Sequence, residues 1–176
     1  MAEKIIQTEY LYRGRLIKLR LDQVRMPNNS MHTREIVEHS GAVAIVALDE
    51  QGRVLLERQY RSAAARETLE IPAGTLENGE DPSLCAVREL REETGYSAAE
   101  WEKLGAFYSS PGFSTEIMYL FLARGLKPGP SSPEEDESIA VEWRPLADAL
   151  AAIENGEIAD AKSMVGLLRV ARKLSL

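Results

Sequence analysis

The fold of this chain is decided by residues 74–96, which read GTLENGEDPSLCAVRELREETGY. Asp81 followed by Pro82 is typical of the start of a helix, and Gly95 is typical of its end, so one helix is predicted between them. A loop that begins with glycine precedes this helix, and glutamates are frequent in both. Acidic residues often serve only to solvate a helix, so only their spacing can indicate a further role.

Three glutamates share one side of the predicted helix. Glu89, Glu92 and Glu93 occupy positions i, i+3 and i+4, which are neighbours on a helix surface. Like charges at this spacing repel, and a helix that needs only solubility would intersperse lysines among them. Hard divalent cations take carboxylate oxygens as ligands, and Mg²⁺ commonly binds together with substrate phosphates. A metal site therefore competes with a plain solvated helix face as the explanation.

The remaining positions of the helix predict how it packs. Leu84, Val87 and Leu90 fall on the side opposite the glutamates, which we expect to face the core. Arg88 precedes Glu92 by four residues, so an ion pair that orients this carboxylate is expected.

The composition indicates a globular protein of ordinary type, because 44% of its 176 residues are hydrophobic and 28% are charged. The single cysteine, Cys85, excludes an intramolecular disulfide and fits a reducing compartment. Neither a secretory signal nor an apolar run near the roughly 20 residues of a membrane span is present, so a cytoplasmic protein without a membrane partner is expected. A net charge of −7 argues against nucleic acid as the partner, although bound cations would still allow a small anionic substrate.

Strand patterns surround the helix. Residues 15–26 alternate between apolar and polar, and with residues 31–39 they predict two strands paired across the turn at 27–30. Residues 41–61 predict a hairpin that turns at Gly52, and its continuous apolar run 42–48 predicts a strand covered on both faces. Further strands are expected at 101–110, 116–126 and 141–146, followed by two helices at 145–158 and 160–174. This order predicts an α+β or sandwich-like domain with mixed sheets.

The spacing within residues 74–96, called the box from here on, also matches a known pattern. Gly74 is followed after five residues by Glu80, and after seven more by REL, one residue, EE, one residue and Gly95-Tyr96. This resembles the signature GX5EX7REUXEEXGU of the Nudix hydrolases, where U is a bulky apolar residue, and a chance match in such a chain is on the order of one in 10⁷. The resemblance implies a Nudix-type α/β/α sandwich with a mixed β-sheet at residues 41–176, preceded by an N-terminal antiparallel β ribbon at residues 1–40.

The resemblance assigns roles within the box. It implies that two or three Mg²⁺ or Mn²⁺ ions are held by Glu89, Glu93 and the carbonyl of Ala73, and that Glu92 and Arg88 complete the catalytic group. Arg88 is expected to orient the glutamates, and Glu80 to brace the loop.

The chain also resembles one branch of that family, the ADP-ribose pyrophosphatases. The feature that carries this resemblance is Pro111, which lies 15 residues after Tyr96. Substrate contacts are therefore expected from Pro111, Gly112, Arg61 and Glu70. Each has a plainer alternative: a turn proline beside a glycine, an exposed arginine at the end of a strand, and a glutamate that braces a loop.

The acidic run Glu134–Glu137 is either a solvated loop or, as in that branch, a loop that closes over the diphosphate. In the second case Glu135 acts on the attacking water and Glu137 reaches a metal, with Glu134 and Asp136 as alternatives in each role.

The resemblance implies Mg²⁺-dependent hydrolysis of ADP-ribose to AMP and ribose 5-phosphate. The alternatives are a pyrophosphatase for another nucleoside diphosphate sugar, one of broad specificity, and a sensor that binds without cleavage. A sensor would be expected to lose box glutamates, and this chain keeps them all. The ribbon has little sequence to cover it, so a homodimer through the N-terminal strands is expected, with an exposed patch of no such role as the alternative.

Overall fold

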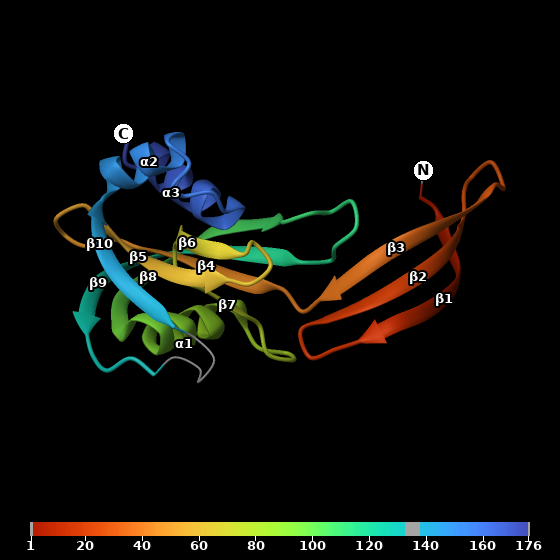
Figure 1. Cartoon of the computed structure of the whole chain (residues 1–176), viewed down its shortest axis with the longest axis horizontal. Coiled ribbons are helices and arrows are strands. Elements are labelled where there is room, and N and C mark those ends of the chain that lie inside the picture. The colour runs from red at the N-terminus through yellow and green to blue at the C-terminus, as the bar shows by residue number, and fades with distance from the viewer. Residues whose placement is uncertain (1, 133–137, 176) are drawn as a thin grey trace. The chain divides into compact units, whose positions relative to one another are not determined.

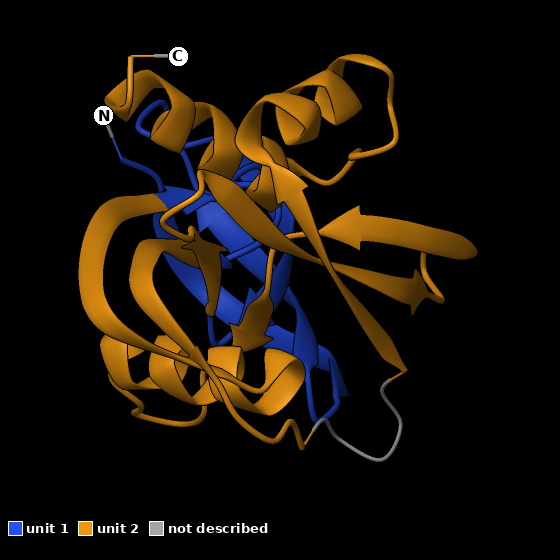
Figure 2. Ribbon diagram, turned by 90° about the vertical axis from the view of Figure 1, so that its left-hand side faces the viewer, with its two compact units in different colours: residues 1–41, 107–117 blue, residues 42–106, 118–176 orange. Residues whose placement is uncertain are grey.

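The computed structural model describes residues 2–132 and 138–175, and the chain divides into two compact units (Figure 2). Unit 1 comprises Met1–Gly41 and Phe107–Ile117, and unit 2 comprises Ala42–Ala106 and Met118–Leu176. The predicted box lies within unit 2.

Unit 1 contains a three-stranded antiparallel sheet of β1 (Lys4–Arg13), β2 (Ile17–Arg25) and β3 (Met31–His39). Strands β2 and β3 pair without a register shift, as predicted, and the turn between them places Asn29 at φ 65°. Strand β1 was not predicted as a separate element. Its apolar side chains alternate poorly, because Ile5 and Ile6 are adjacent and both are exposed.

Unit 2 contains two sheets (Figure 1). One has the order β10-β5-β6, formed by Ile139–Pro145, Arg53–Arg61 and Arg66–Glu70. The other has the order β7-β4-β9-β8, formed by Ala73–Thr75, Ala42–Ala47, Ile117–Pro128 and Tyr96–Tyr108. Strand β4 pairs antiparallel with β7 and parallel with β9, so this sheet is mixed, as expected. The hairpin predicted over residues 41–61 is wrong beyond the single bridge Leu48–Val54, because β5 pairs with β10 and β6 in the other sheet.

Helices cover both sides of these sheets, and this explains the apolar run in β4. Helix α1 (Pro82–Thr94) lies on one side, and α2 (Leu146–Glu154) and α3 (Ala161–Lys173) lie on the other (Figure 1). Residues 42–48 are all at most 6% exposed, which confirms the predicted strand with two covered faces. Helix α3 approaches closely at Gly166, where an added Cβ would lie 2.9 Å from Cδ1 of Ile71. No helix in the described ranges 2–132 and 138–175 is long and apolar enough to cross a membrane.

Helix α1 begins and ends as predicted, but its buried side is different. The Asp81 carboxylate accepts a hydrogen bond from the Ser83 amide at 2.8 Å, and Gly95 ends the helix in the left-handed conformation at φ 76°. The expectation that Leu84 and Val87 face the core is wrong, because they are 66% and 46% exposed.

The reason for this difference is the position of the glutamates. The buried residues of α1 are Cys85, Ala86, Leu90, Glu93 and Thr94. Since Glu93 is turned toward the sheet, the buried stripe is rotated away from Leu84 and Val87.

Gly95 generates a prediction about stability. A Cβ at Gly95 would lie 2.5 Å from the carbonyl oxygen of Gly129 and 2.9 Å from the Ser131 amide, whereas Gly79, at the similar φ of 78°, has nothing within 4 Å. We expect Gly79→Ala to lower the free energy of unfolding by about 1 kcal/mol and Gly95→Ala by about 3 kcal/mol, because only the second adds a backbone collision to the left-handed strain. Urea unfolding of both variants measures this, and equal losses would contradict the close approach.

Candidate active site

Two glutamates of α1 lie against the backbone of β7. A Cβ at Gly74 would lie 1.8 Å from Cδ of Glu89, so only glycine allows this carboxylate to lie where it does. The Ala73 amide donates a hydrogen bond of 3.1 Å to Oε2 of Glu93. The carboxylates of Glu89 and Glu93, one helical turn apart on α1, therefore lie against adjacent residues of β7.

Arg88 lies among the carboxylates of the box. Its Nη1 donates to Oε1 of Glu89 at 2.7 Å and to Oε2 of Glu92 at 3.1 Å, and its Nε and Nη2 each donate to Glu80 at 3.0 Å. The hydrogen bonds from Arg88 lower the pKa of Glu80 from 4.5 to about 2. One guanidinium thus offsets the repulsion that the spacing of the glutamates predicts.

Glu80 also fixes the loop that precedes the helix. Its Oε2 accepts a hydrogen bond of 2.9 Å from the Glu77 amide, in addition to the bonds from Arg88. The loop is thereby connected to the middle of α1 through a single carboxylate.

The donor set suits a hard cation. The side chain of Glu89 is 12% exposed, Glu93 is 5% exposed, and the Glu92 side chain is the most open at 41%. Oxygen donors of this kind are what Mg²⁺ requires, and the space that a side chain at residue 74 would fill is taken by a carboxylate. Among the described residues, no three His, Cys, Asp or Glu side chains are gathered closely enough to hold an ion by themselves.

Arg61 and Glu70 form a second charged group. Nε and Nη2 of Arg61 donate to the two carboxylate oxygens of Glu70 at 3.1 and 2.8 Å, and Lys162 and Thr68 also contact this carboxylate. Burial opposes ionisation of Glu70, but the hydrogen bonds from Arg61 and the charge of Lys162 outweigh it and lower its pKa from 4.5 to about 2.

The participation of Lys162 was not predicted. It lies in the first turn of α3, where the helix dipole disfavours a cation, so a lysine at this position is a signal that could have been read from the sequence DAKS at 160–163.

The other predicted site residues belong to unit 1 or lie outside the described residues. Pro111 and Gly112 belong to unit 1, in an exposed turn between β8 and β9 whose next residue, Phe113, accepts a hydrogen bond of 2.8 Å from the Val37 amide. Glu135 and Glu137, with their alternatives Glu134 and Asp136, lie outside the described residues.

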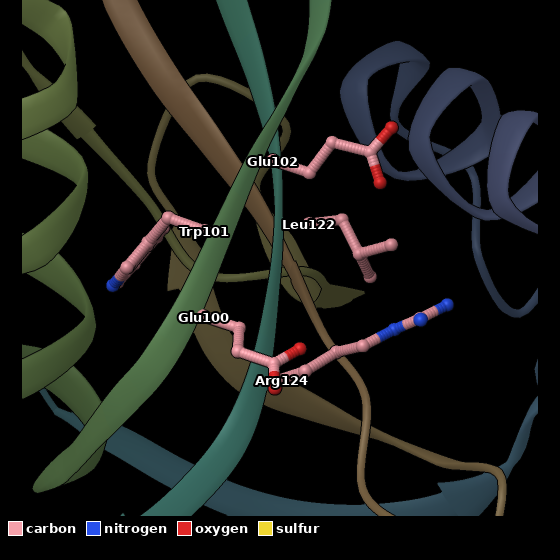
Figure 3. Close-up of a pocket in the computed structure, with 5 residues that line it drawn as sticks. All are labelled: Glu100, Trp101, Glu102, Leu122 and Arg124. Atoms are coloured by element: carbon pink, nitrogen blue, oxygen red, sulfur yellow. The ribbon is translucent and has the colours of Figure 1, made fainter.

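A hollow of about 110 Å³ lies on β8 and β9 and is lined by Glu100, Trp101, Glu102, Leu122 and Arg124 (Figure 3). None of these was predicted as a site residue. Trp101 points away toward α1, and Glu102 points toward α3, where it pairs with Lys173 at 2.8 Å. The hollow is thus separate from the carboxylates of the box.

The low pKa of Glu70 predicts how stability depends on pH. A carboxyl group whose pKa is depressed on folding contributes stability above its ordinary pKa, and this contribution is lost as the pH falls toward the lower value. For a side chain only 4% exposed, we expect a contribution on the order of 3 kcal/mol at pH 7 that declines between about pH 4.5 and pH 2.

The measurement compares wild type with Glu70→Gln by urea unfolding at several pH values. The difference in free energy of unfolding should shrink on acidification. Glu67→Gln, exposed on the same strand, is the control. A difference that stays constant from pH 7 to pH 3 would show that Glu70 gains nothing from its ionised state.

Comparison with known proteins connects this geometry to a family. The model of the NUDIX domain matches residues 38–165, and the model described as nucleoside diphosphate sugar hydrolase N-terminal domain matches residues 3–37. A crystal structure described as ADP compounds hydrolase shares the fold with a TM-score of 0.88, at 24% identity, over 99% of this chain and 95% of the other.

Relatives of similar length support the same assignment. The ADP-ribose pyrophosphatases of Bacillus subtilis and Mycobacterium tuberculosis are 44% and 43% identical, over 93% and 97% of this chain and 89% and 85% of theirs. The methanol dehydrogenase activator of Bacillus methanolicus is 42% identical over 94% of this chain and 90% of its own. Since the domain model spans most of the chain and includes the whole box, the protein belongs to the Nudix hydrolase family.

Proposed function

We propose that this protein hydrolyses the diphosphate of ADP-ribose, adding water across the P–O–P linkage to give AMP and ribose 5-phosphate. The observation that carries the proposal is the convergence of Glu89 and Glu93 on residues 73–74, at the position that Gly74 keeps open. The choice of ADP-ribose is supported by the two relatives described as ADP-ribose pyrophosphatases, which align over nearly the whole chain.

The roles follow from the contacts of the box. Glu89, Glu93 and the carbonyl of Ala73 would hold divalent cations, for which we propose Mg²⁺ or Mn²⁺, two or three per site. When bound, such ions neutralise phosphate charge and lower the pKa of a coordinated water. Arg88 keeps Glu89 and Glu92 in place by hydrogen bonds and remains charged, since its pKa is raised by the bond to Glu80.

Recognition of the diphosphate is assigned to Arg61. Its Nε and Nη2 are held by Glu70, and its side chain is still 41% exposed. The third nitrogen of the guanidinium, Nη1, is therefore available to a phosphate oxygen. The roles of Pro111 and Gly112 toward the substrate, and those of Glu135 and Glu137 toward water and metal, stay predictions.

A second candidate substrate class is another nucleoside diphosphate sugar. The match of residues 3–37 to the N-terminal domain model of nucleoside diphosphate sugar hydrolases favours it, because that description names the class and not ADP-ribose. The chemistry at the diphosphate would be the same.

The experiment that tests both is a screen for hydrolysis with Mg²⁺, using ADP-ribose, GDP-mannose, ADP-glucose and NADH and identifying the products by chromatography. We expect ADP-ribose to be preferred and AMP to be released. Glu93→Gln should reduce kcat at least about 100-fold, because the carboxylate charge that holds the cation is lost while the shape is kept.

The kcat of Glu93→Gln is compared with that of Glu92→Gln, because the side chain of Glu92 is the most exposed of the three box glutamates. Preference for another nucleotide sugar would keep the chemistry and replace the substrate. Binding of ADP-ribose without turnover would favour a sensor. Full activity of Glu93→Gln would show that Glu93 is not a metal ligand.

We also propose that the protein is a homodimer formed through its N-terminal strands. Large apolar side chains of β1 and the following turn are between 43% and 56% exposed, namely those of Ile5, Ile6, Leu11, Tyr12 and Leu16. Exposure of this extent along one edge strand is typical of a surface that a partner covers.

Light scattering at micromolar concentration should therefore give twice the chain mass of 19.5 kDa. Leu11→Asp should shift the mass toward the monomer, because it introduces a charge into the covered surface. Leu168→Asp, at a residue 51% exposed on α3, should leave the dimer intact. A monomeric wild type would exclude this assembly.

A further inference from the structure

The buried carboxylate of Glu70 holds Arg61 in one orientation. Its side chain is only 4% exposed, and both of its oxygens accept hydrogen bonds from Arg61, at 3.1 and 2.8 Å. A paired contact of this kind fixes the plane of a guanidinium as well as its position. Within the described part of the chain, Nη1 of Arg61 makes no hydrogen bond, so one edge of the group stays available.

Lys162, a residue distant in the sequence, contacts the same carboxylate. Its Nζ contacts Oε2 of Glu70, and the pair is 92 residues apart in the chain. Its side chain is 13% exposed, and Nζ is also 3.2 Å from each oxygen of Asp160. A lysine in the first turn of a helix opposes the helix dipole, so this position is explained by its partners and not by helix stability.

The beginning of α3 is attached to the strand segment that leads into the box. Asp160 accepts a hydrogen bond of 3.1 Å from the Ser163 amide as the cap of α3, and the Ser163 hydroxyl accepts one of 2.8 Å from the Ile71 amide. Residue 71 follows Glu70 directly and precedes Ala73 by two positions. Lys162 therefore reaches Glu70 from a backbone that is itself fixed relative to the loop.

The charge of one box carboxylate, Glu93, also acts on Arg61. Hydrogen bonding to Glu70 raises the pKa of Arg61, and the charge of Glu93 adds to that increase. The side chain of Arg61 is also 41% exposed, so it can bind an anion that lies beside the box.

We infer that Lys162 is a positioning residue for substrate binding: by sharing Glu70, it keeps that carboxylate fixed so that Arg61 presents Nη1 to a phosphate oxygen of the diphosphate. This inference rests on the proposed function, because it takes the diphosphate as the group that Arg61 binds. Lys162 itself does not touch the substrate in this arrangement.

The test separates positioning from a general effect on the fold. We expect Lys162→Met to raise KM for ADP-ribose about tenfold while kcat changes less than about twofold, because binding and not the chemical step depends on Arg61. Lys162→Arg, which keeps the cation, should restore KM to within about threefold of wild type. The matched control is Lys173→Met, which removes an exposed ion pair with Glu102 from the last turn of the same helix.

A double-mutant cycle then asks whether Lys162 acts through Arg61. In an Arg61→Ala background, adding Lys162→Met should change KM by less than about twofold, because the group it positions is absent. An unchanged KM in Lys162→Met overturns the inference. So does an equal loss in Lys162→Met and Lys162→Arg, or a cycle in which the two effects multiply.

Equilibrium binding of ADP-ribose distinguishes failure of this inference from failure of the proposed function. If the wild type binds ADP-ribose without hydrolysing it, the function is wrong, and a Kd about tenfold weaker in Lys162→Met still supports the positioning role. If the wild type hydrolyses ADP-ribose and Lys162→Met matches it in KM, the function stands and the inference falls. If the wild type binds another nucleoside diphosphate sugar of the screen and not ADP-ribose, the proposed substrate is wrong, and an unchanged Kd for that compound in Lys162→Met overturns the inference.

Discussion

The guanidinium of Arg88 is the contact on which the box depends. Three glutamates within two turns of one helix repel each other, and Arg88 donates hydrogen bonds to two of them and to Glu80 in the preceding loop. The same residue thus relieves repulsion on α1 and joins the loop to the helix. A lysine could not replace it, because a single ammonium group cannot meet Glu80 with two parallel bonds while also bonding Glu89 and Glu92.

Local features of this fold could be predicted from the sequence because their causes are local. The cap at Asp81, the helix stop at Gly95 and the turn at Asn29 depend on residues within a few positions of each other. The burial of residues 42–48 also follows from their composition. The spacing of the glutamates predicted their common side of α1, and Gly74 explains how Glu89 comes to lie against the backbone.

What could not be predicted depends on partners distant in the sequence. The exposure of Leu84 and Val87 results from Glu93 being turned inward, and hydrophobic spacing alone assigns a glutamate to the outside. The lysine in the first turn of α3 is visible in the sequence, but its partner Glu70 could not be predicted, because the two are 92 residues apart. The third strand of the ribbon, β1, has no buried residue, so its pattern carries little of the alternation by which strands are recognised.

Cys85 has a practical consequence for spectroscopy. It is the one cysteine of the sequence, it is fully buried on α1 within the box, and burial raises the pKa of its thiol. A thiol that is both inaccessible and protonated reacts slowly with maleimides. A second cysteine introduced on an exposed strand would therefore take up a fluorophore or spin label selectively, without first removing the native one from the interior of α1.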